Sequence, residues 1–151
     1  NSNTNIQYRK KVAKLLMWHT VNRHLLISID ETGFSSTNNK YYDWKISNSQ
    51  MIRRRNADRP HKNISLLMGV SMDRVESVML IEGSVDQILF CEFLVSMVRA
   101  IRERTGDAKQ EIVLLLDNLC AHKTFLVKCI IHELNVKVIY NAPYTPELNP
   151  Y

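Results

Sequence analysis

Apolar and polar positions recur at helical spacing in the first part of the chain, between Ile6 and about Asn22. The apolar side comprises Val12, Leu15, Leu16 and His19, and the opposite side carries Arg9, Lys10, Lys11 and Lys14. This pattern predicts an amphipathic helix, in residues 1–24, that packs on the domain following it.

Two continuous apolar runs each end in acidic or amide residues. The run from Leu25 to Asp30 is followed by Glu31, and the run from Ile112 to Asp117 is followed by Asn118. Such runs are typical of strands covered on both faces, and a carboxylate is costly to bury at the end of one. We therefore expect two buried strands, each delivering an Asp to one end of one sheet, with the first strand ending at Asp30.

The remaining strands are predicted by shorter apolar segments. Residues 63–72 and 75–82 form two such segments around Asp73 and Arg74, which suit a tight hairpin turn. Residues 136–140 predict a short strand, and the aromatic segment 41–46 predicts a short strand or hairpin arm.

Two further helices are predicted in the second half of the chain. Ser84 is the expected N-cap of the first, with Gln87 completing a capping-box pattern, and Gly106 is its expected C-cap. The second is expected over residues 123–134. The element order predicts an α/β domain with a mixed sheet, antiparallel strands first and parallel strands later, flanked by helices.

The charge distribution favours a polyanionic partner. The chain of 151 residues carries a formal net charge of +5. Its strongest basic cluster is Arg53, Arg54, Arg55, Arg59, His61 and Lys62, opposed only by Asp58. We interpret this cluster as an extended loop that contacts phosphates, although a solvated surface loop has the same pattern.

The cysteines and the apolar runs exclude other classes of protein. Cys91, Cys120 and Cys129 are odd in number and lack CxxC spacing, which disfavours a disulfide framework or a zinc site. No apolar run reaches the roughly 18 residues of a membrane span. We expect an intracellular protein with reduced thiols.

The two strand-end aspartates suggest metal chemistry. Two carboxylates at the ends of adjacent strands can hold one Mg²⁺, which prefers oxygen ligands, and a third would allow a two-metal site for phosphoryl transfer. The alternative is that Asp30 and Asp117 merely end their strands as turn formers.

Four short motifs, in order, decide between these alternatives. They are Asp30-Glu31-Thr32-Gly33-Phe34, Ile81-Glu82-Gly83-Ser84, Asp117-Asn118-Leu119-Cys120-Ala121-His122, and the proline-rich segment from Asn141 to Pro150. Together they make residues 25–151 resemble the catalytic domain of Tc1/mariner (IS630-like) DDE transposases. The resemblance implies an RNase H-like fold and a metal-dependent activity that cleaves DNA at transposon ends and joins it to target DNA.

The resemblance also implies the site. Asp30 matches the first acid of the family's triad and Asp117 the second, and the complete triad binds two Mg²⁺ or Mn²⁺ ions. The family's usual spacing puts the third acid directly after Tyr151, so we expect this chain to be a fragment that lacks it and is inactive on its own. Glu147 lies at a variable position of the Pro-Glu-Leu-Asn-Pro motif and is not assigned to the triad.

Residues around the two acids receive supporting roles. Asn118 is expected to orient the neighbouring carboxylate. His122 matches a histidine that follows the Asp-Asn motif in the family, and its role is either at the active site or as a capping or structural group at a helix entry. Glu31 is expected on the opposite face of its strand from Asp30, as a supporting or surface carboxylate.

DNA is the partner that the resemblance implies. The predicted DNA-contacting residues are Arg53, Arg54, Arg55, Arg59 and Lys62, in the position of a family loop that touches DNA and the partner subunit. Tyr42 and Trp44 could stack on unpaired bases, or belong to the core. We also expect a homodimer on DNA, and a location in the nucleus of a eukaryote or in the cytoplasm and nucleoid of a bacterium.

Two alternative hypotheses for the function remain open. One is a domesticated or decayed transposase that binds DNA without catalysis, which an acid directly after Tyr151 would disfavour. The other is a different RNase H-like nuclease, which the four motifs disfavour. Recognition of a transposon end needs a helix-turn-helix module, and the sequence shows none.

Overall fold

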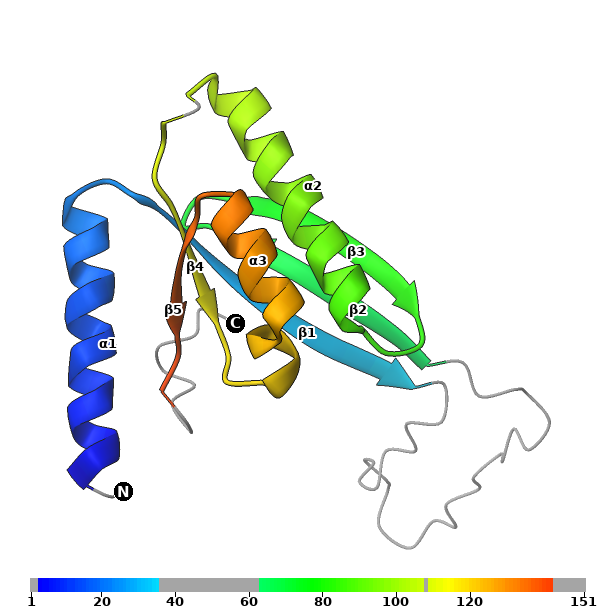
Figure 1. Cartoon of the computed structure of the whole chain (residues 1–151), viewed down its shortest axis with the longest axis horizontal. Helices are drawn as coiled ribbons and strands as arrows, with labels where there is room; N and C mark the ends of the chain where they lie inside the picture. The colour runs from blue at the N-terminus through cyan, green and yellow to red at the C-terminus, as the bar shows by residue number, and fades with distance from the viewer. Residues whose placement is uncertain (1–2, 36–62, 108, 143–151) are drawn as a thin grey trace, which may run out of the picture.

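The computed structural model describes residues 3–35, 63–107 and 109–142, which form a five-stranded mixed sheet with helices on both faces (Figure 1). The strands are β1 (Leu25–Ser35), β2 (Asn63–Val70), β3 (Val75–Glu82), β4 (Ile112–Leu116) and β5 (Lys137–Tyr140), in the spatial order β3-β2-β1-β4-β5. The helices are α1 (Asn3–Val21), α2 (Gln87–Thr105) and α3 (Phe125–Glu133), and a 3₁₀ turn, η1, spans Cys120–Lys123. This is the expected α/β architecture.

The sheet has an antiparallel half and a parallel half. β1 pairs antiparallel with β2 from Ser28 opposite Val70 to Ser35 opposite Asn63, and β2 pairs antiparallel with β3. On its other edge β1 pairs in parallel with β4, and β4 in parallel with β5. The predicted order of antiparallel strands followed by parallel ones is confirmed.

Helices α2 and α3 cover one face of the sheet and form the main core. Alternate residues of β1, Ile27 and Ile29, face this side with Leu67 of β2, and all of them are buried. Helix α2 contributes Phe90, Phe93, Leu94, Met97, Val98 and Ile101 at the predicted helical spacing. Burial of large apolar side chains on this face supplies most of the hydrophobic stabilisation of the domain.

Helix α1 covers the opposite face with a smaller core. Val12 is buried there against Val113, Leu115 and Ile139, with Leu16 and Leu26 partly buried beside them. His19 is also buried, as expected, but Leu15 is exposed, so its assignment to the packing side was wrong. Fewer residues of α1 contact the sheet than predicted, because only Val12, Leu16 and His19 lie on the side of the helix that faces it.

The first strand is longer than the sequence indicated. β1 continues past Asp30 for five more residues, because the antiparallel ladder with β2 extends to Ser35. Asp30 and Glu31 are therefore inside the strand, just past Ser28, where the parallel ladder with β4 stops. The prediction that the chain turns away after Asp30 was wrong.

Helix boundaries also differ from the predictions. Asp86, not Ser84, caps α2, and its carboxylate accepts hydrogen bonds from Ile88 N and Leu89 N at 2.9 Å each. Gly106 ends α2 in the left-handed conformation, as predicted. The last predicted helix, residues 123–134, is α3, which begins at Phe125 because the Thr124 side chain caps it, and the 3₁₀ turn η1 precedes it.

The hairpin and the thiols agree with the sequence more closely. β2 and β3 are joined through Ser71–Arg74, where Ser71 N donates to Arg74 O at 2.9 Å, so β2 ends two residues earlier than predicted. All three cysteines are free. None of the helices in the described ranges has the length and apolar character to cross a membrane.

Candidate active site

Asp30 and Asp117 lie on neighbouring parallel strands at the same end of the sheet. The ladder joins Ser28 of β1 to Leu115 of β4, and the same register extended by two residues brings Asp30 level with Asp117. Ser28 and Leu115 both point toward the α1 side, and the alternation of β1 places Asp30 on that side too, while Asp117 directly follows the last residue of β4. Adjacent strands therefore present two carboxylates at one level.

Asp30 opens into a shallow cavity on β1 and β2. The cavity, of about 250 Å³, is lined by Asp30, Glu31, Thr32, Leu66 and Met68. Met68 is the register partner of Asp30 and Leu66 that of Thr32, so an apolar wall flanks the acid. Asp30 is half-buried, and its Oδ1 accepts a hydrogen bond from Glu31 N at 2.9 Å.

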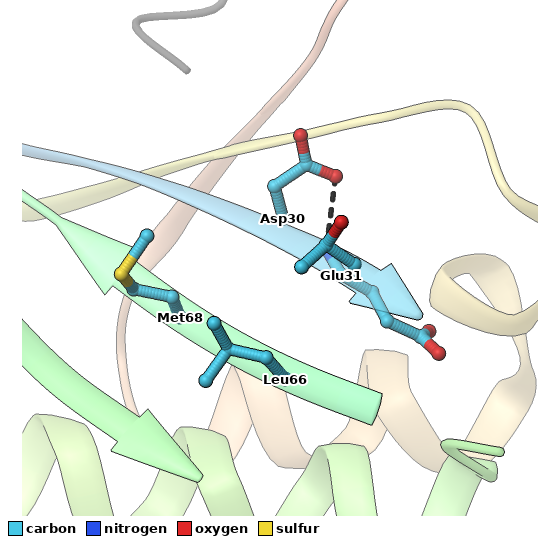
Figure 2. A pocket seen from close by; sticks show the side chains of 5 residues that line it. Asp30, Glu31, Leu66 and Met68 are labelled. Atoms are coloured by element: carbon cyan, nitrogen blue, oxygen red, sulfur yellow. Dashed lines mark hydrogen bonds between the residues drawn. The ribbon is translucent and has the colours of Figure 1, made fainter. Parts of the chain in front are cut away.

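Glu31 leaves the strand on the other side. Figure 2 shows the carboxyl groups of Asp30 and Glu31 pointing away from each other. Glu31 pairs with Leu67, a residue of the main core on the α2 side. It is therefore poorly placed to share a ligand with Asp30.

Asp117 is held by its own loop. Its Oδ1 accepts a hydrogen bond from Leu119 N at 3.1 Å and lies 2.7 Å from Nδ1 of His122. About two fifths of the Asp117 side chain is exposed, whereas His122 is buried. The carboxylate is thus fixed on one side and open on the other.

His122 is locked in place by packing. Its ring stacks on Phe90 of α2, with centroids 4.3 Å apart and an interplanar angle of 23°. Its carbonyl oxygen accepts a hydrogen bond from the Tyr140 hydroxyl at 3.2 Å. These contacts join η1 to α2 and β5, and they fix the nitrogen that faces Asp117.

Asn118 and Lys123 form a second brace beneath the loop. The Asn118 amide donates to Asn141 O, and the Asn118 Oδ1 accepts from Lys123 Nζ at 2.7 Å. Lys123 Nζ also lies 5.0 Å from the centre of the Tyr140 ring, and Asn141 N donates to Leu116 O at 2.7 Å. The side chain of Asn118 therefore ties the end of β4 to the end of β5 instead of pointing at the Asp117 carboxylate.

Sequence reasoning missed Phe90, Lys123 and Tyr140 as parts of this site. The sequence pattern predicted Phe90 as a core residue and Lys123 as the start of a helix, because a local pattern does not indicate tertiary contacts with other elements. The Asn141-Ala142 motif was the one available signal, since it directly follows β5 beside the Asp117 loop.

The described residues contain no larger cluster of metal-binding side chains than a pair. Within residues 3–35, 63–107 and 109–142, no group of three or more His, Cys, Asp or Glu side chains is arranged to hold a metal ion. The predicted DNA-contacting residues Arg53, Arg54, Arg55, Arg59 and Lys62 lie outside the described ranges, as do Tyr42, Trp44 and Glu147.

Comparison with known proteins decides the family. The profile of the DDE superfamily endonucleases matches residues 25–151, from the first residue of β1 onward. The chain belongs to this family. No curated protein is similar enough in sequence to match the chain.

Solved structures similar to this DDE endonuclease chain include complexes and domains of the Mos1 transposase. A pre-cleavage Mos1 transpososome superposes with a TM-score of 0.75 at 19% identity, covering 99% of this chain and 46% of the other. The Mos1 paired-end complex with the left transposon end gives a TM-score of 0.72 at 18% identity, with the same coverage. The Mos1 catalytic domain with Raltegravir and Mg gives 0.70 at 19% identity, covering 99% of this chain and 68% of that domain.

These similarities establish the fold. They confirm the expected RNase H-like domain, and the chain spans less than half the length of the complete Mos1 chains that it matches.

Proposed function

We propose that this chain is the catalytic core of a Tc1/mariner-type DDE transposase, which cleaves DNA at transposon ends and joins the freed 3′-hydroxyl to target DNA. The observation that carries the proposal is the pair Asp30 and Asp117, level with each other on adjacent parallel strands of a DDE endonuclease domain. Two carboxylates in this relation suit a hard divalent cation.

Asp30 and Asp117 would hold Mg²⁺ or Mn²⁺, the ions named with Mos1 structures. Their fit rests on the donors: both are carboxylates, both are only half-buried, and Asp30 borders a cavity open to solvent. A bound metal supplies Lewis acidity and lowers the pKa of a bound water or hydroxyl.

The residues around Asp117 act by positioning. The Leu119 amide and the His122 ring fix the Oδ1 of Asp117, which leaves the other oxygen free to bind a ligand. Phe90 holds His122 in turn, so a change at Phe90 or His122 acts on the direction of the Asp117 carboxylate.

DNA is the substrate that the proposal requires. Mos1 has been solved in complexes with transposon ends, and the basic cluster Arg53, Arg54, Arg55, Arg59 and Lys62 supplies cations for phosphate contacts. Changing Arg53, Arg54 and Arg55 together to Gln should flatten the salt dependence of DNA binding. An unchanged slope would remove this segment from the interface.

The decisive test of the reaction is strand nicking. A protein extended past Tyr151 should nick transposon-end DNA in Mg²⁺ or Mn²⁺, and Asp30→Asn or Asp117→Asn should reduce the rate by more than 10³-fold, roughly the 4 kcal/mol scale of a lost transition-state interaction. Asp73→Asn, an exposed acid in the β2–β3 turn, is the matched control. Nicking that survives in Asp30→Asn would overturn the assignment, and DNA binding without nicking would favour a non-catalytic protein.

A further inference from the structure

The outer face of α1 carries a groove built from one helical stripe. Gln7, Lys10, Lys11, Lys14, Leu15 and Trp18 line it, and all six are exposed. Gln7, Lys10 and Lys14 lie on the side of the helix opposite its buried residues, Val12 and His19. Lys11, Leu15 and Trp18 lie on the flank, so most of the groove faces away from the sheet. Packing of α1 on the sheet leaves this face uncovered.

The charge of α1 is one-sided. The helix contains Arg9, Lys10, Lys11 and Lys14 and no Asp or Glu. Within the described ranges, none of the three lysines makes an ion pair with a carboxylate. Solvated helices commonly interleave acids with bases at i, i+4, and like charges at that spacing are destabilising. A polyanion bound along the stripe would relieve this repulsion.

Trp18 adds an aromatic surface to the lysine stripe. Its side chain is 52% exposed, although the ring edges contact His19 and His24 at centroid distances of 4.8 and 5.3 Å. The ring is therefore anchored and still presents half of its surface to solvent. Cations with a fixed, exposed aromatic side chain are the combination that nucleic-acid sites use.

The helix also lies at the correct end of the sheet. The Tyr8 hydroxyl donates to Tyr140 O at 3.2 Å, and Tyr140 pairs with Leu116, the residue before Asp117. The N-terminal half of α1, which holds Lys10 and Lys11, thus lies at the end of the sheet where Asp117 follows β4, with β5 between the helix and β4 (Figure 1).

We propose that the outer face of α1 binds the phosphate backbone of duplex DNA through Lys10, Lys11 and Lys14, with Trp18 against the strand. This surface is made of other residues than the basic cluster at 53–62. The inference rests on the proposed function, because that function makes DNA the substrate of the domain.

The test is the salt dependence of DNA binding, measured without metal. Fluorescence anisotropy of a labelled 20-base-pair duplex is followed in EDTA over a range of NaCl concentrations, with the chain and with its Lys10→Gln, Lys11→Gln, Lys14→Gln triple variant. The slope of log K against log salt should fall by up to about 2.7, since each phosphate contact contributes about 0.9. Gln keeps the helix propensity of Lys, and circular dichroism checks the fold.

A second triple variant is the matched control. Arg99→Gln, Lys109→Gln and Lys128→Gln remove the same charge from exposed positions on α2, the loop after it and α3. This variant should keep the slope of the unmodified chain. An equal decrease of the slope in both triple variants would mean that only net charge matters, and it would overturn the proposal. An unchanged slope in the α1 variant would overturn it as well.

Two further measurements separate the alternatives. In a Trp44→Phe background, the fluorescence of Trp18 should change on addition of DNA, and no change would contradict its contact. If the α1 variant instead lost binding to phosphatidylserine vesicles, or lost a dimer seen by light scattering, while its DNA slope stayed unchanged, the occupant would be a membrane or a second copy. Because Asp30 and Asp117 play no part in this assay, its failure would leave the catalytic proposal standing.

Discussion

The two faces of the sheet are built for different purposes. On the α2 side, Ile27, Ile29, Leu67 and the buried stripe of α2 form a continuous apolar core, covered by two helices. On the α1 side, a single helix covers a small cluster around Val12. Where that cover ends, the residues of β1 that face this side are polar: Ser28, Asp30 and Thr32. The α2 face supplies most of the buried apolar surface, while the α1 face leaves carboxylates exposed to solvent with little loss of apolar burial.

This difference teaches how a buried strand can carry an acid. β1 pairs with β4 from Leu25 to Ser28 and with β2 from Ser28 to Ser35, so Asp30 lies where β2 still holds the backbone but the cover of α1 has ended. Rigid strands position a ligand more exactly than loops do. The loop after β4 lacks that support, and the contacts of Asp117 and Asn118 supply it.

The largest contrast between the faces should appear in core truncations. Phe93→Ala on α2, where the side chain is fully buried, should lower the free energy of unfolding by about 3–5 kcal/mol. Val12→Ala on α1 should cost about 1.6 kcal/mol, from two lost methyl groups, with increased hydrogen exchange confined to α1. Urea denaturation measures both, and equal costs would contradict the division of stability between the faces.

A smaller contrast concerns two glycines. A Cβ on Gly69 would lie 2.5 Å from Met97 Sδ in the main core, whereas a Cβ on Gly33 meets nothing within 4 Å. Gly69→Ala should therefore destabilise the domain by about 1–3 kcal/mol through overpacking, and Gly33→Ala should change it little. Chemical denaturation of the two variants makes the comparison, and a stable Gly69→Ala would show that this core has room.

The smallest contrast is in pH dependence, and it belongs to the α1 side. Burial, and then the neighbouring His24, lower the pKa of His19 below 6.5, and the Nδ1 atoms of the two rings lie 2.7 Å apart. Lys137 also lowers this pKa, and Glu111, 3.3 Å from His24 Nε2, opposes the shift. The folded protein therefore holds fewer protons than the unfolded chain just below pH 6.5.

Stability from His19 should be complete above pH 6.5 and decline as the pH falls through the lowered pKa. Thermal unfolding at pH 7.5 and 5.5 should show this loss, and His19→Asn should reduce the dependence. The same pH dependence in His19→Asn would assign it to other groups.

Much of the fold follows from the sequence for a physical reason. The apolar runs of β1 and β4 and the stripe of α2 are set by burial, which the residue pattern records directly. The length of β1 is different, because its last five residues are strand only through the ladder with β2. The N-cap of α2 was also mispredicted, because Ser84 and Asp86 are both suitable N-cap residues and the helix begins after Asp86.

The positions of the two candidate acids could be predicted from the sequence, but the residues that hold the Asp117 loop in place could not. Asp30 and Asp117 stand in recognisable motifs at the ends of apolar runs, so their common level on adjacent parallel strands could be expected. The stacking of Phe90 on His122 and the bond from Lys123 to Asn118 join residues of separate elements. A pattern along the chain holds no record of such tertiary contacts.

The central claim is that Asp30 and Asp117 bind one divalent ion together, and Mn²⁺ titration calorimetry of the 151-residue chain tests it most directly. The chain should bind one Mn²⁺ weakly, Asp30→Asn and Asp117→Asn should each weaken binding at least tenfold, and Asp73→Asn should bind like the unmodified chain. No binding by the unmodified chain at millimolar Mn²⁺, or equal binding by all four proteins, would contradict the account.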